Sequence, residues 1–372
     1  MAQRGPGAMR VFTIGPDGVG ESAQPPARLP AQGHLWLACS RSEFEARWSE
    51  LQATLQALCG TALIDLHVSD LLNPQLPSHF DPTSQYDLLI FRRLATQRTE
   101  AAVPPAAGAR RGGPPILRHI DTAPIGFAVF ERVLLSVHPD DCAIRDAYAA
   151  RLQGSGAPDV RHASSRLPTS PADLMLRIVA LAVDGFLDLR RELTRQLDHW
   201  QTELLNPRTR FSNWSALLQA RLVLHQLDET GEDQRSAILA WIETLKSWPE
   251  AGDAARQRER ELLLVRSRDV LEHIERVVHH VQRLEHSVET AVQIHFNAQS
   301  HRTNDIMRTL TVLTAIFLPL NLIAGIFGMN FDAIPLIHSA SGFWWTLAAM
   351  AATAVALTVY FWRKRYLERS GR

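Results

Sequence analysis

Polar and small side chains recur every three or four residues along an apolar stretch near the C-terminus. This spacing keeps successive residues on one side of a helix, so it predicts a stripe on a helix packed in a left-handed bundle. Uncharged amide and hydroxyl oxygens can hold the water shell of a strongly hydrated cation such as Mg²⁺ without removing it. The stripe therefore predicts a path for a hydrated cation. Its members are Asn304, Met307, Thr311, Thr314, Leu318, Asn321, Gly325 and Gly328.

Helix–helix packing is the alternative explanation of this stripe. Asn321 lies near the middle of the stretch, where an amide is costly unless it faces protein or water, and threonines at this spacing also join helices. A single helix cannot enclose a path, so the pore interpretation requires several copies around one axis. The opposite side is apolar and suits lipid or a second span. It carries Leu310, Val312, Leu313, Ile316, Phe317, Leu320, Ile323 and Ile326.

The stripe lies on a predicted transmembrane helix. Thr309–Phe331 contains no charged residue, and a helix of 23 residues spans a hydrocarbon core of roughly 30 Å. A second uncharged run, Phe343–Trp362, follows. Basic residues flank the pair at Arg308 and Arg363, whereas the loop Asp332–Gly342 has no Lys or Arg. The positive-inside rule therefore places both termini in the cytoplasm and the loop outside.

A long helix is predicted to position the first span. It begins near Pro249 and meets no breaker before Pro319. An apolar seam with steps of three and four predicts that its cytoplasmic part packs along partner helices. The seam consists of Val270, Ile274, Val277, Val281, Leu284 and Val288. A cytoplasmic rod that continues into a membrane helix would couple the two mechanically.

The rest of the chain predicts a domain of mixed strands and helices followed by further helices, so the expected fold class is an α+β cytoplasmic domain with a long stalk helix and a C-terminal hairpin of two transmembrane helices. Strands are expected at His34–Cys39, Tyr86–Leu94, Pro124–Phe130 and Arg132–His138, with a helix over Glu43–Leu58. Ser170 and Pro171 predict the start of a helix that runs to Leu205. The chain is expected to begin with a flexible N-terminus at 1–30, which holds one short strand over Val11–Ile14. An α/β domain at 31–165, a helical hairpin region at 166–248 and the stalk helix at 249–308 follow. The chain then has transmembrane spans at 309–331 and 343–362, joined by the loop 332–342, and a basic tail at 363–372. Residues 99–115 are an expected insertion.

Composition excludes several classes of protein. The chain has 39 basic and 39 acidic residues, so its net charge provides no general attraction to nucleic acid. Cys39, Cys59 and Cys142 are scattered and form neither a zinc knuckle nor a disulfide framework. No phosphate-binding loop, GxSxG or HExxH motif occurs, so we expect neither an ATPase, an enzyme nor an organic cofactor. Arg-rich, Lys-poor usage indicates a GC-rich bacterial source and hence the bacterial cytoplasmic membrane.

The end of the first span resembles the CorA family of divalent-metal transporters. Gly328-Met329-Asn330 lies within LPLNLIAGIFGMNF (Leu318–Phe331), which is similar to that family's signature. The resemblance implies a homopentameric, funnel-shaped channel for Mg²⁺, with Co²⁺ and Ni²⁺ as further ions. It also implies that Gly328, Met329 and Asn330 form the outer selectivity filter. The deeper positions that match pore-lining ones are Asn304, Met307, Leu310, Thr314, Leu318 and Asn321; Leu310 lies off the stripe derived above.

The resemblance also implies gating by cytoplasmic Mg²⁺. The matching carboxylates are Asp70, in HVSDLLNP, and Asp269, in SRDVLEH, which would face each other between subunits. Without the resemblance both residues read as ordinary surface acids. Ser69 stands where family members often carry a second acid. Asp332 is the only acid of the outer loop and would form a ring at the mouth.

Two other functions remain open from the sequence. The ZntB-like zinc transporters share the fold and the GMN motif, so the chain could carry Zn²⁺. A membrane-anchored coiled-coil scaffold without conduction is the alternative from another class. The uncharged polar stripe argues against a scaffold, which would need only apolar or small residues for packing.

Overall fold

The computed structural model describes residues 9–16, 18–95, 120–154, 167–205, 214–248, 253–329 and 341–364. The chain divides into two units, one of residues 1–203 with 210–288, the other of residues 204–209 with 289–372. The predicted insertion at 99–115 lies outside the described residues.

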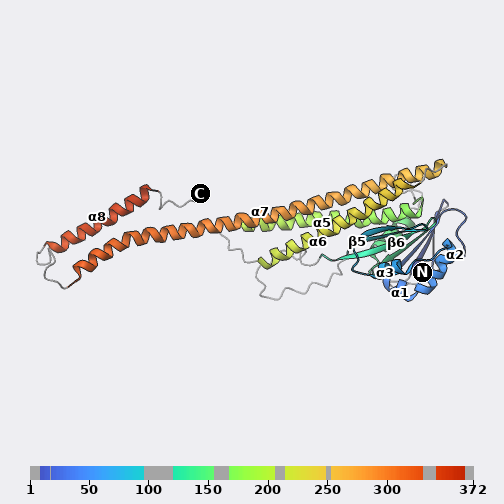
Figure 1. The fold of residues 1–372 in the computed structure, drawn as a ribbon, viewed down its shortest axis with the longest axis horizontal. Helices are drawn as coiled ribbons and strands as arrows, with labels where there is room; N and C mark the ends of the chain where they lie inside the picture. Colours follow the sequence, from blue (N-terminus) through green and yellow to red (C-terminus); the bar gives the residue numbers. More distant parts are fainter. Residues whose placement is uncertain are drawn as a thin grey trace. The chain divides into compact units, whose positions relative to one another are not determined.

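The first unit is built on a seven-stranded sheet in the order β2-β1-β3-β7-β6-β5-β4. Figure 1 labels β5 and β6 of this sheet. β3 and β7 pair in parallel, and the other neighbouring pairs are antiparallel. The strands are β1 (Arg10–Gly15), β2 (Gly18–Ser22), β3 (His34–Ser40), β4 (His79–Pro82), β5 (Asp87–Leu94), β6 (Thr122–Val129) and β7 (Val133–His138).

Alternating apolar residues give the sheet two buried faces. In β3, Trp36 and Ala38 join one core, whereas Leu35, Leu37 and Cys39 join the other. The second core is covered by α1 (Arg41–Ala46), α2 (Trp48–Cys59) and α3 (Asp65–Leu72). The first is covered by α4 (Ala143–Gly154), α5 (Pro171–Leu205), α6 (Trp214–Ser247) and the N-terminal part of α7 (Ala254–Phe327). The result is a three-layer arrangement of helices, sheet and helices.

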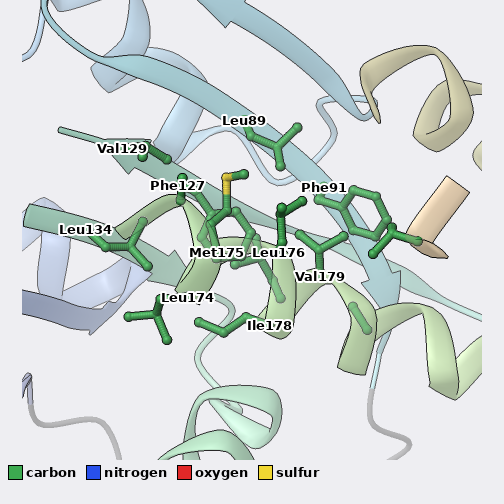
Figure 2. Packing of buried hydrophobic residues seen from close by; sticks show 14 of the residues in the cluster. Leu89, Phe91, Phe127, Val129, Leu134, Leu174, Met175, Leu176, Ile178 and Val179 are labelled. Atoms are coloured by element: carbon green, nitrogen blue, oxygen red, sulfur yellow. The ribbon is translucent and has the colours of Figure 1, made fainter. Parts of the chain in front are cut away.

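The start of α5 fills the first core. Figure 2 shows Met175, Leu176 and Val179 of α5 against Phe91 and Phe127 of the sheet. All five side chains are buried, so this packing contributes on the order of 2 kcal/mol for each apolar side chain removed from water. The α5 helix is thereby fixed on the sheet.

The structure differs from the sequence-based expectation at the N-terminus. Residues 1–30 were expected to be flexible apart from a short strand, but both β1 and β2 belong to the sheet. Phe12 and Ile14 are buried against the first core, which explains why this edge is ordered. β2 and β4 are short edge strands that contain Gly or Pro, and such strands give little periodic signal.

Gly231 does not interrupt α6. A notch in the helix is expected there because glycine is a poor helix former, yet α6 continues from Trp214 to Ser247. A Cβ at Gly231 would lie 2.6 Å from Cγ2 of Val278 in α7. The glycine therefore allows a close approach between α6 and α7.

α7 packs through its predicted seam. Val270, Ile274, Val277, Val281, Leu284 and Val288 are all buried. On the same side, Ser267 Oγ accepts a buried hydrogen bond of 2.9 Å from Trp241 Nε1 of α6. The seam prediction is confirmed for these residues.

A buried carboxylate joins α5 to α7. Ser170 caps α5 by accepting from the Asp173 amide, and Asp173 Oδ2 accepts from the Thr169 amide at 3.1 Å. The same carboxylate lies 3.3 Å from Arg177 Nη2 and 2.8 Å from Arg266 Nε of α7. Asp173 has no exposed surface, so its charge depends on these two guanidinium groups.

The second unit contains the C-terminal part of α7 and α8 (Gly342–Arg363). α8 has exposed aromatic side chains near both ends, Phe343, Trp344 and Trp345 at one and Tyr360 and Trp362 at the other. Aromatic residues at both ends of an apolar helix are typical of the two membrane interfaces.

We expect the substitution Asp173→Asn to destabilise the protein by about 2–3 kcal/mol, because it leaves two guanidinium groups without their shared carboxylate. Asp184→Asn, at an exposed position of the same helix, is the matched control. Thermal unfolding of the purified full-length protein measures the difference. Equal unfolding temperatures for the two variants would contradict the role given to Asp173.

Candidate functional site

The predicted polar stripe lies on the last part of α7. The helix continues through Pro319 and ends at Phe327, where the Gly328 amide donates to the Ala324 carbonyl at 2.9 Å. The stripe residues Asn304, Met307, Thr311, Thr314, Leu318, Asn321, Gly325 and Gly328 are all exposed, as is Met329. Asn330 and Asp332 lie outside the described residues. The stripe is therefore an uncovered surface of the single chain.

Apolar side chains next to the stripe are uncovered too. Leu313 and Phe317 are each 53% exposed, and only 6% of the most hydrophobic window of α7 is buried. Two helices among the described residues, α7 and α8, are long and apolar enough to cross a membrane. Soluble monomers rarely expose so much apolar surface to water, so these helices need lipid or further protein around them.

The stripe threonines present oxygen atoms outward. Thr311 Oγ1 donates to the Met307 carbonyl at 2.8 Å, and Thr314 Oγ1 donates to the Leu310 carbonyl at 2.9 Å. Each hydroxyl proton is thereby used within the helix, which leaves the oxygen lone pairs as acceptors. Acceptors of this kind suit the water molecules around a cation.

A shallow groove marks the middle of the stripe. Its lining consists of Leu310, Thr311, Thr314, Ala315, Leu318 and Pro319. Leu310 was placed off the stripe by its spacing, and the structure nevertheless puts it in this groove beside Thr311 and Thr314. Pro319 has no N–H, so the Ala315 carbonyl lacks its usual helical donor. Sequence reasoning treated Pro319 only as a helix breaker and missed this acceptor.

The helix α3, which carries Asp70, is held by a polar network centred on the buried His67. His67 Nδ1 lies 2.8 Å from Tyr86 Oη, and His67 Nε2 lies 2.9 Å from Asp81 Oδ2. The Ile64 amide donates to the same Tyr86 oxygen at 3.1 Å. In the tautomer that satisfies all three contacts, Tyr86 donates to Nδ1 and Nε2–H donates to Asp81. Burial raises the pKa of Tyr86, which keeps the hydroxyl proton in place.

A glycine of strand β6 allows α3 to pack closely against the sheet. A Cβ at Gly126 of β6 would lie 2.1 Å from Cδ2 of Leu71, the residue after Asp70. The packing of Leu71 and the bonds of His67 together fix the helix on the sheet. Asp70 is then half-exposed on its surface. Spacing alone gave no signal for His67, Tyr86 or Asp81, because the three come from different elements.

The two predicted regulatory carboxylates are not brought together within one chain. α3 and the N-terminal part of α7 belong to the layers on opposite faces of the sheet. Asp269 has 66% of its side chain exposed and lies 3.9 Å from His273 Nε2. Among the described residues there is no group of three or more His, Cys, Asp or Glu side chains that could hold a metal ion. A site that uses both Asp70 and Asp269 needs a second chain.

An arginine anchors α7 one turn before Asp269. Burial lowers the pKa of Arg266, and the Asp173 carboxylate acts in the opposite direction. Arg266 stays beside Asp173 in the ion pair described above. The backbone that carries Asp269 is therefore tied to the start of α5.

Known proteins resemble the chain in sequence and in fold. A family model described as CorA-like Mg²⁺ transporter protein matches residues 46–365. The cobalt/magnesium transport protein CorA of Thermotoga maritima is 35% identical over 100 residues, which cover 27% of this chain and 28% of that protein. The magnesium transport protein CorA of Haemophilus influenzae is 33% identical over 104 residues, 28% of this chain and 33% of that protein. These sequence matches span a third of the relatives' length or less.

The fold match extends over the whole chain. The structure of the CorA magnesium transporter from Methanocaldococcus jannaschii matches with a TM-score of 0.71 and 16% identity, covering 100% of this chain and 99% of that chain. The full-length CmaX protein matches with a TM-score of 0.61 and 15% identity, covering 98% and 100%. The expected α+β domain with a long helix and two C-terminal apolar helices is confirmed. Together with the family match over residues 46–365, these findings show that the chain belongs to the CorA-like Mg²⁺ transporter family.

Proposed function

We propose that five copies of this chain form a pore that conducts hydrated divalent cations across the membrane, chiefly Mg²⁺ and also Co²⁺ and Ni²⁺. The observation that carries the proposal is the exposed, uncharged polar stripe at the end of α7. From Leu310 to Met329, every other exposed residue is apolar. Facing lipid, the Asn321 amide would lose its hydrogen bonds to water, whereas facing a shared axis it retains them. The names of the curated relatives, magnesium and cobalt transport proteins, support the choice of ions.

The stripe favours a cation that keeps its water shell. It carries no carboxylate that would replace water ligands, and Mg²⁺ gives up water reluctantly. Threonine and asparagine oxygens can accept hydrogen bonds from the water shell. The Ala315 carbonyl, freed by Pro319, adds a backbone acceptor in the groove. Met307, Leu310 and Leu318 supply apolar rings, and loss of water from these rings can close the path.

The outer mouth belongs to Gly328, Met329 and Asn330. Gly328 and Met329 follow the end of α7 in its last hydrogen-bonded turn. Five Asn330 side chains would offer amide oxygens to the hydrated ion, and five Asp332 carboxylates would raise its local concentration. With both termini in the cytoplasm of a bacterium, the membrane potential would drive passive entry, with about 4.6 kcal/mol per 100 mV for a divalent cation.

Gating would occur where Asp70 of one copy meets Asp269 of the next. Two carboxylates across an interface repel each other unless a cation lies between them, so cytoplasmic Mg²⁺ would hold neighbouring copies together. Loss of that cation would loosen the contact and open the pore. Asp269 and the stripe are on one helix, α7, which gives the contact a direct route to the pore.

The substitution Asn330→Ala tests the filter. We expect Mg²⁺ flux into proteoliposomes to fall and discrimination between cations to weaken, because the ring of amide oxygens is lost. Flux equal to that of the unmodified protein would remove Asn330 from this role. A competition series with Mg²⁺, Co²⁺, Ni²⁺ and Zn²⁺ in the same assay distinguishes a magnesium pore from a zinc transporter of the same fold.

Thr314 and Thr358 form a matched pair for the pore wall. Both lie in apolar helices, are exposed, and donate to the carbonyl four residues earlier, but only Thr314 is on the stripe. We expect Thr314→Val to lower Mg²⁺ flux by about tenfold, because it removes an acceptor for the water shell without changing side-chain volume. Thr358→Val should conduct normally. Equal effects of the two substitutions would assign Thr314 to packing alone.

Asp269→Ala tests the regulatory contact. Closure by millimolar Mg²⁺ on the cytoplasmic side should require a higher Mg²⁺ concentration, because one carboxylate of each interface is missing. Asp188→Ala, at an exposed position on α5, serves as the control. Patch recording of the reconstituted protein measures the concentration for half closure. An unchanged value for Asp269→Ala would place the regulatory site elsewhere.

A further inference from the structure

Several arginines of the helical layer have an acidic partner. Carboxylates lie within 4.0 Å of Arg177, Arg221, Arg235, Arg266 and Arg276. Arg190 of α5 and Arg283 of α7 have no carboxylate within 4.0 Å among the described side chains, and the same holds for Arg258, Arg260 and Arg268 nearer the start of α7. Arg283 donates only to the His279 carbonyl at 3.3 Å. The guanidinium groups of Arg190 and Arg283 therefore have most of their donors available.

Both arginines lie one turn from the same contact between α5 and α7. Thr194 Oγ1 is 2.9 Å from His280 Nε2, and the Thr194 hydroxyl donates to the Arg190 carbonyl at 2.9 Å. His280 Nε2–H is therefore the donor to Thr194, and its Nδ1 carries the lone pair. Arg190 precedes Thr194 by four residues and Arg283 follows His280 by three, so each shares a helix face with its partner in the bridge.

The charges that act on the His280 ring are positive. Burial lowers the pKa of His280, and the nearby charges of Arg190 and Arg283 lower it further. No carboxylate contributes to that shift. Glu285, on the next turn of α7, lies 4.0 Å from Arg221 of α6 instead. Two cations from two helices thus act on one imidazole, and a small anion would relieve their repulsion.

We propose that Arg190, Thr194, His280 and Arg283 form a binding site for the phosphate group of a soluble compound. A phosphate carries up to two negative charges and several acceptor oxygens, which match two guanidinium forks. Thr194 and His280 hold the two helices together beneath it. A lipid headgroup is out of reach, because His280 precedes the first residue of the span, Thr309, by about 43 Å of helix.

Phosphate bound here would tie α5 to α7 on the cytoplasmic side. The site uses neither Asp70, Asp269 nor any stripe residue, so it is separate from the pore and from the regulatory contact proposed above. Its occupancy can be measured without ion flux. Failure of the pore proposal and failure of this one are therefore distinguishable.

Isothermal titration calorimetry of the full-length protein in nanodiscs tests the site, with inorganic phosphate and metal-free ATP as separate probes and sodium chloride at matched ionic strength as the blank. We expect Arg190→Gln and Arg283→Gln each to weaken phosphate binding by at least about tenfold, because each removes a charged donor. Arg190→Lys and Arg283→Lys should restore part of the affinity, since the charge is retained.

Arg276→Gln is the matched control, because Arg276 is exposed on α7 but bonded to Glu272 at 2.7 Å. It should leave phosphate binding unchanged. No binding above the chloride blank, or equal weakening in Arg276→Gln, would overturn the proposal. Binding that depends on anionic lipid in the nanodisc, and not on the phosphate added, would also overturn it.

Discussion

The structure depends on one constraint, which is that an amide such as that of Asn321 loses its hydrogen-bonding partners in hydrocarbon. Asn321 lies in the middle of an uncharged helix, in phase with two threonines and two glycines. The single chain leaves this face uncovered. In a ring of several copies around a common axis, the polar face would contact water and the apolar side would contact lipid. The same constraint explains why the polar residues form a stripe instead of being scattered.

The N-terminal part of α7 obeys a different constraint. There the helix is held against its partner helices by an apolar seam. Val270, Ile274 and Val281 are buried, and Gly231 of α6 lets the backbones approach at Val278. One helix thus changes its environment along its length while its hydrogen-bonded backbone continues. That continuity is the route by which the proposed gating at Asp269 would reach the stripe.

The charged groups of the helical layer fall into one cluster that stabilises the packing and one that is proposed to bind a ligand. Asp173 is buried between two arginines, and this arrangement fixes the start of α5 on α7. Arg190 and Arg283 lie farther along the same two helices and lack such a partner. A charge that is neutralised internally stabilises packing, whereas a pair of cations left open attracts an anion. The difference between the two clusters is one carboxylate.

Local pattern determined much of this protein. The apolar spans, the stripe, the seam of α7 and the capped start of α5 all follow from spacing along one element, which the sequence displays directly. Tertiary structure decided what depends on several elements. It placed β1 and β2 in the sheet, joined His67, Tyr86 and Asp81 beneath α3, and put Leu310 into the groove of the stripe. It also put Asp70 and Asp269 in layers on opposite faces of the sheet. Spacing could not reveal these relations, because contacts between distant segments arise only when the chain folds.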